Sequence, residues 1–429
     1  MPTIRLKYGR THADVELCSG NEVLSVMPNE IPPVRDFEKV FLASLDHPLF
    51  SLSLGELARQ NGSKPVVIVA NDPTRLANSE QFLPLLVDYL GRAGVPDRQM
   101  SIVFACGSHR PMSDSEMGEL VGPEVKRRIA CHNHVATDGD SLVYYGETSF
   151  GTPVWLNRRV AEAGLRVLTG SIVHHFFAGF GGGRKALVPG VAGHATIQKN
   201  HSMMLQDGAE IGRLEGNPVH LDLLEAARMV GGGFLVNVVL NEAHEFAGVF
   251  AGDMEEAHEA GCALVERANG VLLPWQADVV IAGCGGHPKD INVYQAQKTL
   301  DNAAQAVRQG GQIVLLAQCP DGVGSETYHD WARKYKTLPE LETALRADFV
   351  LGGHKAYAVA RLLARATVQL VSGMPQQLVE ELGFTYAASA QQAADRALDA
   401  AGLSCRVLVM PEGSITVPAK HQERCGGAA

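Results

Sequence analysis

The segment Val66-Val-Ile-Val-Ala70 decides the fold class, because a short apolar run rich in β-branched residues is typical of a strand buried in a parallel sheet. A helix is predicted over Glu80–Ala93, and a second strand over Ser101–Ala105 follows it. Further elements are a third strand over 166–173 and helices over 52–61, 193–201 and 218–229. Strands that alternate with helices predict an α/β domain with a mainly parallel sheet.

The chain divides near residue 272, where Pro274 precedes a fresh apolar strand. Beyond this point the predicted strands are 278–282, 312–317, 368–372 and 406–410, and the helices between them are 293–308, 338–346 and 389–401. This alternation is typical of a doubly wound sheet. The sequence therefore predicts two α/β domains with mainly parallel sheets, an N-terminal domain over 1–272 and a Rossmann-like domain over 273–429.

The composition indicates a globular enzyme rather than a disordered or nucleic-acid-binding protein. Of the 429 residues, 20% are charged and 46% hydrophobic, and the net charge is −10. A negative balance argues against a general nucleic-acid or anionic-membrane surface. No apolar run is long enough to span a bilayer, and the eight cysteines form no C-x-x-C pair. We expect a cytoplasmic protein without nucleic-acid or membrane partners, and the sequence leaves its oligomeric state open.

Polar loops follow each of the first three predicted strands. They are Asn71-Asp-Pro-Thr-Arg75, the segment with His109 and Arg110, and the segment with His174 and His175. In open α/β sheets, ligands bind at the carboxyl ends of the strands. An arginine there can grip a carboxylate or phosphate with two parallel hydrogen bonds. Taken singly, each loop could equally be an ordinary turn or carry a structural histidine, but together they favour a binding site.

A glycine-rich segment, Gly181-Gly-Gly-Arg-Lys185, follows the third strand. Consecutive glycines let backbone amides approach a ligand closely and adopt positive φ angles. The segment is not a Walker loop, because Ala186 stands where that motif requires serine or threonine. The alternative is a mobile surface loop.

Tyr294-Gln-Ala-Gln-Lys298 opens the first predicted helix of the second domain. Gln295 and Lys298 are three residues apart, so they share one helix face. That face is either a binding surface or an ordinary exposed one.

Together these segments resemble the lactate racemase family, whose members carry a nickel pyridinium-3,5-bisthiocarboxylate mononucleotide, the nickel-pincer nucleotide. The order and spacing agree over about residues 66–325. The matching elements are Asp72-Pro-Thr-Arg75, Gly107-Ser-His-Arg110, His175-Phe-Phe-Ala-Gly-Phe-Gly-Gly-Gly-Arg-Lys185, Asn200-His201, Tyr294-Gln295 with Lys298, and Cys319-Pro-Asp-Gly-Val-Gly324.

The resemblance implies a role for each matching residue. Lys185 is expected to bind the cofactor covalently, and His201 to be the protein ligand of the nickel. His109 and His175 correspond to the two acid/base residues, with His175 chosen over His174 by its spacing to Lys185. Cofactor-synthesis proteins are the implied partners for loading.

The resemblance also assigns the pocket. Asp72, Thr74 and Arg75 are expected in the cofactor-binding pocket of the N-terminal domain, with Arg75 also holding the substrate carboxylate. Tyr294, Gln295 and Lys298 are expected to bind the substrate from the C-terminal domain. The active site should then lie at the domain interface.

The chemistry of inverting a 2-hydroxy acid agrees with these residue types. Its Cα–H bond is weakly acidic, so removal as hydride is easier than removal as a proton, and only a cofactor can accept hydride. The hydride must return to either face of a planar keto acid, so the hydroxyl of each enantiomer needs its own base. Two histidines suit this task. Nickel with soft sulfur donors would need one imidazole from the protein. The predicted function is a racemase or epimerase of a 2-hydroxy acid; the alternatives are a nicotinamide-dependent dehydrogenase and a non-catalytic cofactor-binding or sensing protein.

One departure from the family bears on the substrate. His354 and Lys355 stand at a predicted glycine-flanked strand end, where some lactate-using relatives present bulky apolar side chains. A buried ammonium needs a polar partner. Either Lys355 faces solvent, or it meets a polar group of a substrate larger or more polar than lactate, such as a dicarboxylic hydroxy acid or a sugar acid.

Overall fold

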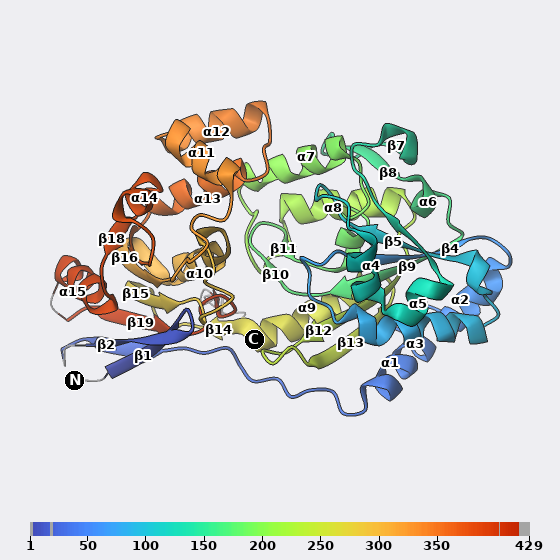
Figure 1. Cartoon of the computed structure of the whole chain (residues 1–429), viewed down its shortest axis with the longest axis horizontal. Helices are drawn as coiled ribbons and strands as arrows, with labels where there is room; N and C mark the ends of the chain where they lie inside the picture. Colours follow the sequence, from blue (N-terminus) through green and yellow to red (C-terminus); the bar gives the residue numbers. More distant parts are fainter. Residues whose placement is uncertain (1–2, 18–19, 403, 420–429) are drawn as a thin grey trace, which may run out of the picture. The chain divides into compact units, whose positions relative to one another are not determined.

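The computed structural model describes residues 3–17, 20–402 and 404–419. Residue contacts divide the chain into two compact units (Figure 1). The central unit is Glu30–Ala268, and the terminal unit combines Met1–Asn29 with Asn269–Ala429. Each unit contains one six-stranded sheet.

The sheet of the central unit has the strand order β13-β12-β9-β4-β5-β6, and all its neighbours are parallel except the β12/β13 pair. Its strands are β4 (Val66–Asn71), β5 (Met100–Ala105), β6 (Ala130–Asn133), β9 (Leu165–Ser171), β12 (Phe234–Leu240) and β13 (Phe246–Gly252). Two small hairpins are added, β7 (Leu142–Glu147) with β8 (Pro153–Asn157) and β10 (His174–His175) with β11 (Gly179–Phe180).

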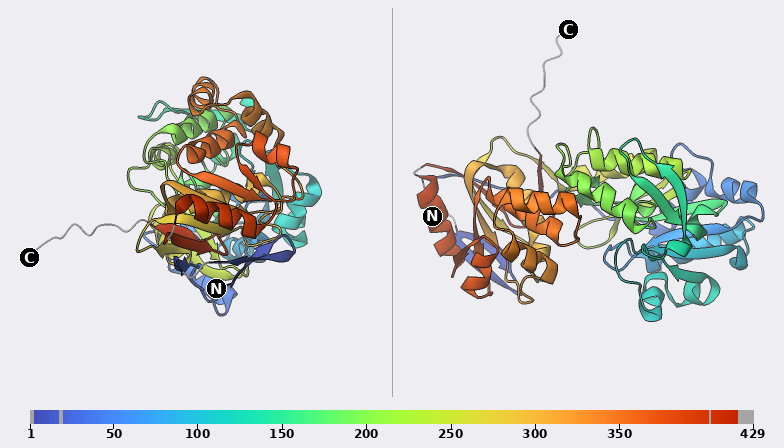
Figure 2. Two further views of the ribbon diagram at one scale, coloured as in Figure 1. Left: turned by 90° about the vertical axis from the view of Figure 1, so that its left-hand side faces the viewer. Right: turned by 90° about the horizontal axis from the view of Figure 1, so that it is seen from above.

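Helices cover both faces of this sheet, as the views in Figures 1 and 2 show. Val66, Ile68 and Ala70 of β4 lie in a core with Phe41 and Phe82, while Val67 and Val69 are buried on the opposite face. The helices are α1 (Phe37–Asp46), α2 (Leu54–Asn61), α3 (Ser79–Arg92), α4 (Asp114–Val121), α5 (Pro123–Arg128), α6 (Arg158–Ala161), α7 (His194–Ser202), α8 (Pro218–Met229) and α9 (Glu256–Asn269).

The sheet of the terminal unit has the order β18-β17-β16-β15-β19-β3 and is parallel throughout. Its strands are β3 (Glu22–Ser25), β15 (Ala277–Gly283), β16 (Val307–Leu316), β17 (Thr367–Val371), β18 (Thr385–Ala387) and β19 (Arg406–Met410). Beside it lie the hairpin β1 (Thr3–Tyr8) and β2 (Thr11–Glu16), and the pair β14 (Gly270–Leu272) and β20 (Val417–Ala419). The helices are α10 (Val293–Ala306), α11 (Glu326–Lys334), α12 (Leu338–Ala347), α13 (Gly353–Leu363), α14 (Gln376–Glu381) and α15 (Ala390–Ala401).

The fold class predicted from the sequence, two α/β domains with mainly parallel sheets, is confirmed. The predicted division into 1–272 and 273–429 differs from the structure at the N-terminus. Residues 1–29 belong to the terminal unit, because β3 pairs with β19 and Leu6 and Val15 enter the same core as Val279 and Val407. Their apolar pattern did not reveal that partner, since strand pairing over such a sequence distance leaves no local signal.

Two local predictions are wrong. The third strand ends at Ser171 rather than Val173, which leaves the next residues free to form the β10/β11 hairpin. His354 and Lys355 lie not at a strand end but in the first turn of helix α13. Lys355 is only 6% exposed, so the solvent-facing alternative for this side chain is also wrong.

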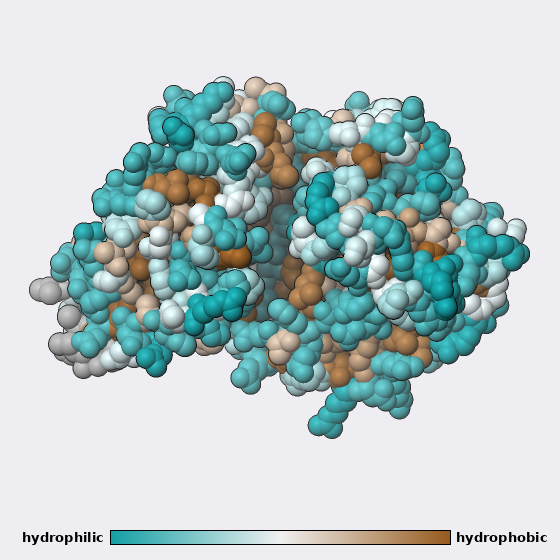
Figure 3. All heavy atoms as spheres, in the orientation of Figure 1, coloured by the Kyte–Doolittle hydropathy of each residue, from teal (hydrophilic) through white to brown (hydrophobic). Residues whose placement is uncertain are grey.

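Figure 3 shows a mostly hydrophilic face with small, separate apolar groups. Among the described residues, no helix combines the length and apolar character needed to cross a membrane. The six cysteines of the described segments are free thiols.

Candidate functional site

The three polar loops predicted to form a site meet at one edge of the central sheet. Strand β4 pairs in parallel with β5 on one side and with β9 on the other, so all three strands end together. Asn71 is aligned with Ala105 at these ends. The Ser171 hydroxyl donates to the Leu76 carbonyl at 2.6 Å, which ties the loop after β4 to the end of β9.

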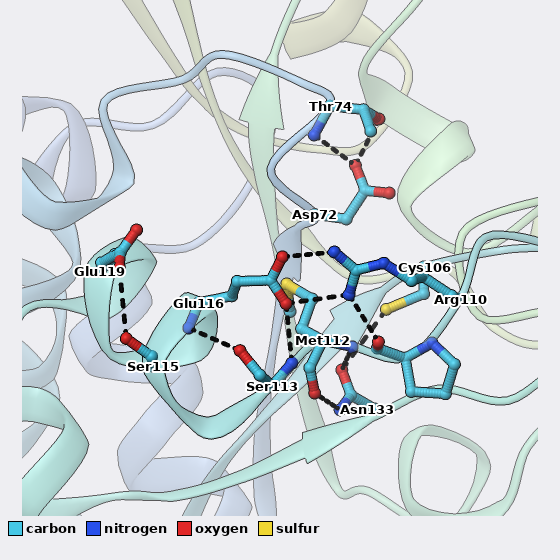
Figure 4. Close-up of polar contacts among 11 residues, drawn as sticks. Asp72, Thr74, Cys106, Arg110, Met112, Ser113, Ser115, Glu116, Glu119 and Asn133 are labelled. Carbon is cyan, nitrogen blue, oxygen red and sulfur yellow. Dashed lines mark hydrogen bonds and ion pairs between the residues drawn. The ribbon is translucent and has the colours of Figure 1, made fainter.

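Asp72 organises the first of these loops. Its buried carboxylate accepts hydrogen bonds from the Thr74 amide at 3.1 Å and the Thr74 hydroxyl at 2.7 Å (Figure 4), and it pairs through its other oxygen with Nδ1 of His109. Burial alone would raise the pKa of the Asp72 carboxyl, but the hydrogen bonds from His109 and Thr74 and the charge of Arg75 outweigh it. The pKa of Asp72 therefore lies below its ordinary value.

The contact with Asp72 sets the hydrogen-bonding character of His109. A carboxylate only accepts, so Nδ1 of the ring carries a proton directed at Asp72. In the neutral ring, Nε2 is then left with a lone pair that can accept a proton. The His109 side chain is 38% exposed, so this nitrogen is within reach of a ligand.

The two arginines of these loops are placed differently. Arg75 is exposed and hydrogen-bonds through Nη1 to the Thr74 hydroxyl at 3.0 Å and the Thr74 carbonyl at 3.2 Å. Arg110 donates to both carboxylate oxygens of Glu116, at 2.9 and 2.5 Å, and fixes the start of α4 (Figure 4). Arg110 is thus engaged in local structure, whereas Arg75 lies at the ligand edge of the sheet.

The adjacent histidines of β10 have different surroundings. Nε2 of His174 lies 2.9 Å from a carboxylate oxygen of Glu266, and its ring lies 4.8 Å from that of Phe180. Nδ1 of His175 instead accepts a hydrogen bond from the Ala178 amide at 3.3 Å. In a neutral ring the proton of His175 is therefore on Nε2. His174 is held as part of the structure, while the Nε2 edge of His175 is a donor.

Phe177 contacts three of the predicted site residues, a role that was not predicted although Phe177 lies inside the matching segment from His175 to Lys185. Its ring centroid lies 4.5 Å from that of His175 and 5.2 Å from that of His201, both edge to face. The Lys185 ammonium nitrogen lies 5.7 Å from the same centroid. His175, Lys185 and His201 are thus gathered around one buried aromatic ring.

The glycine segment before Lys185 is buried and fixed, not a mobile surface loop. The Gly183 amide donates to the side-chain oxygen of Asn237 at 2.8 Å. A Cβ on Gly183, whose φ is +57°, would lie 2.5 Å from the ring of His258. Arg184, 1% exposed, donates to the Ala178 carbonyl at 2.9 Å and lies 3.2 Å from His258. These contacts fix the backbone from which Lys185 projects.

His201 is held by the packing of α7 on α8. The preceding residue, Asn200, is fully buried and donates to the carboxylate of Asp222 at 2.7 Å. Asp222 also accepts hydrogen bonds from the hydroxyls of Thr148 and Thr152. The Asn200-His201 pair of the sequence pattern therefore joins an anchoring residue to a candidate ligand.

Burial and nearby cations lower the pKa values of all three groups in this cluster. Burial, with Arg184 and Arg75, lowers the pKa of Lys185 well below its ordinary value. Burial, followed by Lys185 and Arg75, likewise lowers the pKa of His175 well below the ordinary imidazole value. Burial and the neighbouring Lys185 lower the pKa of His201 to about 3. The uncharged, nucleophilic form of the Lys185 amine is thereby favoured, and both imidazoles keep a lone pair at neutral pH.

The residues predicted in the second domain lie on helix α10 of the terminal unit. Asn292 caps the helix by accepting from the Gln295 amide at 2.9 Å. The Tyr294 amide donates to the Val323 carbonyl at 3.1 Å, so the Cys319–Gly324 motif holds the start of the helix. Tyr294 and Gln295 are half-buried, and Lys298 is exposed.

The described residues contain no group of three or more His, Cys, Asp or Glu side chains arranged for a metal ion.

Comparison with known proteins gives matches over both units. A family model described as the lactate racemase N-terminal domain matches residues 8–212, and one described as the lactate racemase C-terminal domain matches residues 273–417. The chain is 36% identical over 377 residues to a lactate racemase of Lactiplantibacillus plantarum, covering 86% of this chain and 88% of that protein. It is 30% identical over 383 residues to a lactate racemase of Thermoanaerobacterium thermosaccharolyticum, covering 88% and 89%.

The structure is also similar to solved structures of other proteins. The lactate racemase apoprotein from Thermoanaerobacterium thermosaccharolyticum matches with a TM-score of 0.88 and 28% identity, covering 98% of this chain and all of that one. A protein from Thermotoga maritima, 19% identical with a TM-score of 0.66 over 92% of this chain, shares the fold.

The Asp72 geometry gives a pH-dependent prediction. A carboxyl whose pKa is lowered on folding stabilises the native state above its unfolded pKa, and this contribution is lost as the pH falls through the folded value. Asp72→Asn should therefore lower the unfolding free energy by about 1–3 kcal/mol near pH 7, and the difference from wild type should shrink below about pH 4. Urea unfolding monitored by circular dichroism at several pH values measures this.

Asp114→Asn is the matched control, because Asp114 is 85% exposed in its ion pair with Lys126. Its effect should stay within about 1 kcal/mol. Equal stability of Asp72→Asn and wild type at neutral pH would contradict the inferred role of Asp72.

Proposed function

Because the chain belongs to the lactate racemase family, we propose that it is a racemase or epimerase that inverts C2 of a 2-hydroxy acid. The proposed cofactor is the nickel-pincer nucleotide, bound covalently to Lys185. The observation that carries the proposal is the gathering of His175, Lys185 and His201 around Phe177. A dehydrogenase or a non-catalytic binding protein, the alternatives from the sequence, would need no such neutral cluster.

The residues present fit this cofactor. Burial and the nearby cations lower the pKa of Lys185, which favours the uncharged amine that attachment through an amide-type bond requires. His201 keeps its lone pair at neutral pH, so it can donate to nickel while sulfur donors of the cofactor complete the coordination. The positive-φ glycines Gly182 and Gly183 pack closely against Asn237 and His258, which fixes the backbone that presents Lys185. When bound, the cofactor supplies reversible acceptance of the C2 hydrogen as hydride.

We assign the proton transfers to His109 and His175. The hydroxyl of the substrate must lose its proton as the C2–H bond breaks and regain one when the opposite face is reduced. His109, oriented by Asp72, presents an accepting Nε2, whereas neutral His175 presents a donating one.

The remaining proposed roles concern binding. Arg75, exposed and supported by Thr74, is suited to hold the substrate carboxylate. Asp72 and Thr74 shape the cofactor pocket, although the Asp72 carboxylate is already occupied by hydrogen bonds from Thr74 and the pairing with His109. Tyr294, Gln295 and Lys298 stay predicted substrate-binding residues. Cofactor-synthesis proteins stay the predicted partners for loading.

The covalent attachment can be tested by mass. Lys185→Ala should abolish covalent loading, since no other amine is placed on this loop, while wild type produced with the cofactor-synthesis proteins should gain the cofactor mass. Intact-protein mass spectrometry makes the comparison. Lys199→Ala is the control, because Lys199 is exposed on α7 and should load normally. An equal adduct on Lys185→Ala would refute the assignment.

Alanine variants test which of the two neighbouring histidines is the acid/base residue. In loaded protein, His109→Ala and His175→Ala should each lower kcat by at least about 10²–10⁴-fold, as expected for a lost general acid or base. His174→Ala should lower kcat much less, because His174 pairs with Glu266. Racemisation is followed by chiral chromatography. A larger loss from His174→Ala than from His175→Ala would show that the assignment belongs to the other histidine.

A further inference from the structure

Helix α13 begins with a buried lysine. Lys355 lies in its first turn, 6% exposed, and its ammonium nitrogen lies 4.9 Å from the ring centroid of Tyr294 on α10. The turn is fixed by close packing, because the Gly352 amide donates to Nδ1 of His354 at 3.1 Å and a Cβ on Gly353 would lie 2.6 Å from the Trp331 ring. Lys355 is thus set beside one of the proposed substrate-binding residues.

A carboxylate lies in the same cluster. Tyr294, Lys298 and Asp301 are spaced by four and three residues, so they share one face of α10. Among nearby cations, Lys355 lowers the pKa of the Asp301 carboxyl most, and exposed Arg361 comes next. Burial raises the pKa of Asp301 to about 6, and one of its oxygens is buried with no hydrogen-bond partner in the described structure.

A third polar group adjoins this carboxylate. Tyr328 of α11 is 1% exposed, and its hydroxyl also lacks a hydrogen-bond partner in the described structure. Asp301 contributes to raising the pKa of Tyr328, so the two groups feel one another's charge. Unsatisfied buried polar atoms each carry a free-energy cost. A buried cluster that retains such atoms is better explained by a ligand than by stability.

We propose that Lys355 and Asp301 form a polar subsite beside Tyr294 that binds an oxygen-bearing group carried by the substrate beyond C2. The preferred substrate is then a 2-hydroxy acid with a further hydroxyl or carboxylate in its side chain. This inference rests on the proposed racemase function. For the methyl group of lactate, an apolar wall would suffice.

Two pairs of acids with equal numbers of heavy atoms test the proposal. Glycerate and 2-hydroxybutyrate differ by a hydroxyl in place of a methyl, and malate and 2-hydroxy-4-methylpentanoate by a carboxylate in place of an isopropyl group. For loaded wild type, kcat/KM should favour the polar member of at least one pair by about tenfold or more. Lys355→Met, of similar length, should reduce that preference by about tenfold or more. Lys336→Met, at an exposed position of the same unit, should leave it unchanged.

The Asp301→Asn variant distinguishes a carboxylate from a hydroxyl as the added group of the substrate. If the added group is a carboxylate, removing the Asp301 charge should increase the preference for malate. If it is a hydroxyl, removing an acceptor should decrease the preference for glycerate. A thermal-shift titration of unloaded wild type and Lys355→Met with the same acids gives a readout independent of turnover, and the polar members should raise the melting temperature of wild type more.

The outcomes distinguish a failure of the polar subsite from a failure of the proposed racemase function. If loaded wild type racemises none of the acids, the proposed function fails. If it racemises lactate and the apolar acids as well as their polar counterparts, the polar subsite is refuted while the racemase stands. Should Lys355→Met fail to fold, the wild-type preference and the Asp301→Asn variant decide the question.

Discussion

The parallel pairing of β4 with both β5 and β9 is the constraint on which the candidate site depends. It makes three strands end at one edge, and the loops that follow carry Asp72, His109 and His175. No single loop holds a complete set of chemical groups. Because most residues of these strands are buried, the core on both faces fixes their register and thereby the positions of the loops that follow. The candidate site therefore depends on the pairing of all three strands.

A second constraint concerns the charged groups around Lys185. Asn237 and His258 hold the glycine backbone, and Arg184 is buried behind it with no carboxylate bonded to it in the described structure. Burial lowers the pKa of Arg184 to about 10, so it stays protonated at neutral pH. Burial is the main cause of the lowered pKa values of Lys185, His175 and His201; Arg75 lowers all three further, and Arg184 lowers those of Lys185 and His175. The same cations attract anions, and both a nucleotide phosphate and a substrate carboxylate are anionic.

Much of this arrangement could be predicted from the sequence, because the strands of the main sheets are short apolar runs and the site residues follow them directly. The choice between His174 and His175 stays a prediction, though the contact between His174 and Glu266 agrees with it. What the sequence did not reveal depends on contacts between distant segments. The pairing of β3 with β19 and the contacts of Phe177 are of this kind. The helical start of α13 was missed because its glycines were interpreted as a strand boundary.

The central claim is that the C2 hydrogen leaves and returns as hydride while His109 and His175 handle only the hydroxyl proton. The most direct measurement uses loaded protein with a single enantiomer of a 2-hydroxy acid deuterated at C2, in ordinary water. Mass spectrometry of the inverted product then reports the isotope at C2. The account predicts that the product retains its deuterium, because a transferred hydride does not exchange with solvent. Replacement of the deuterium by solvent hydrogen at the rate of inversion would contradict it, since that result requires proton abstraction at carbon.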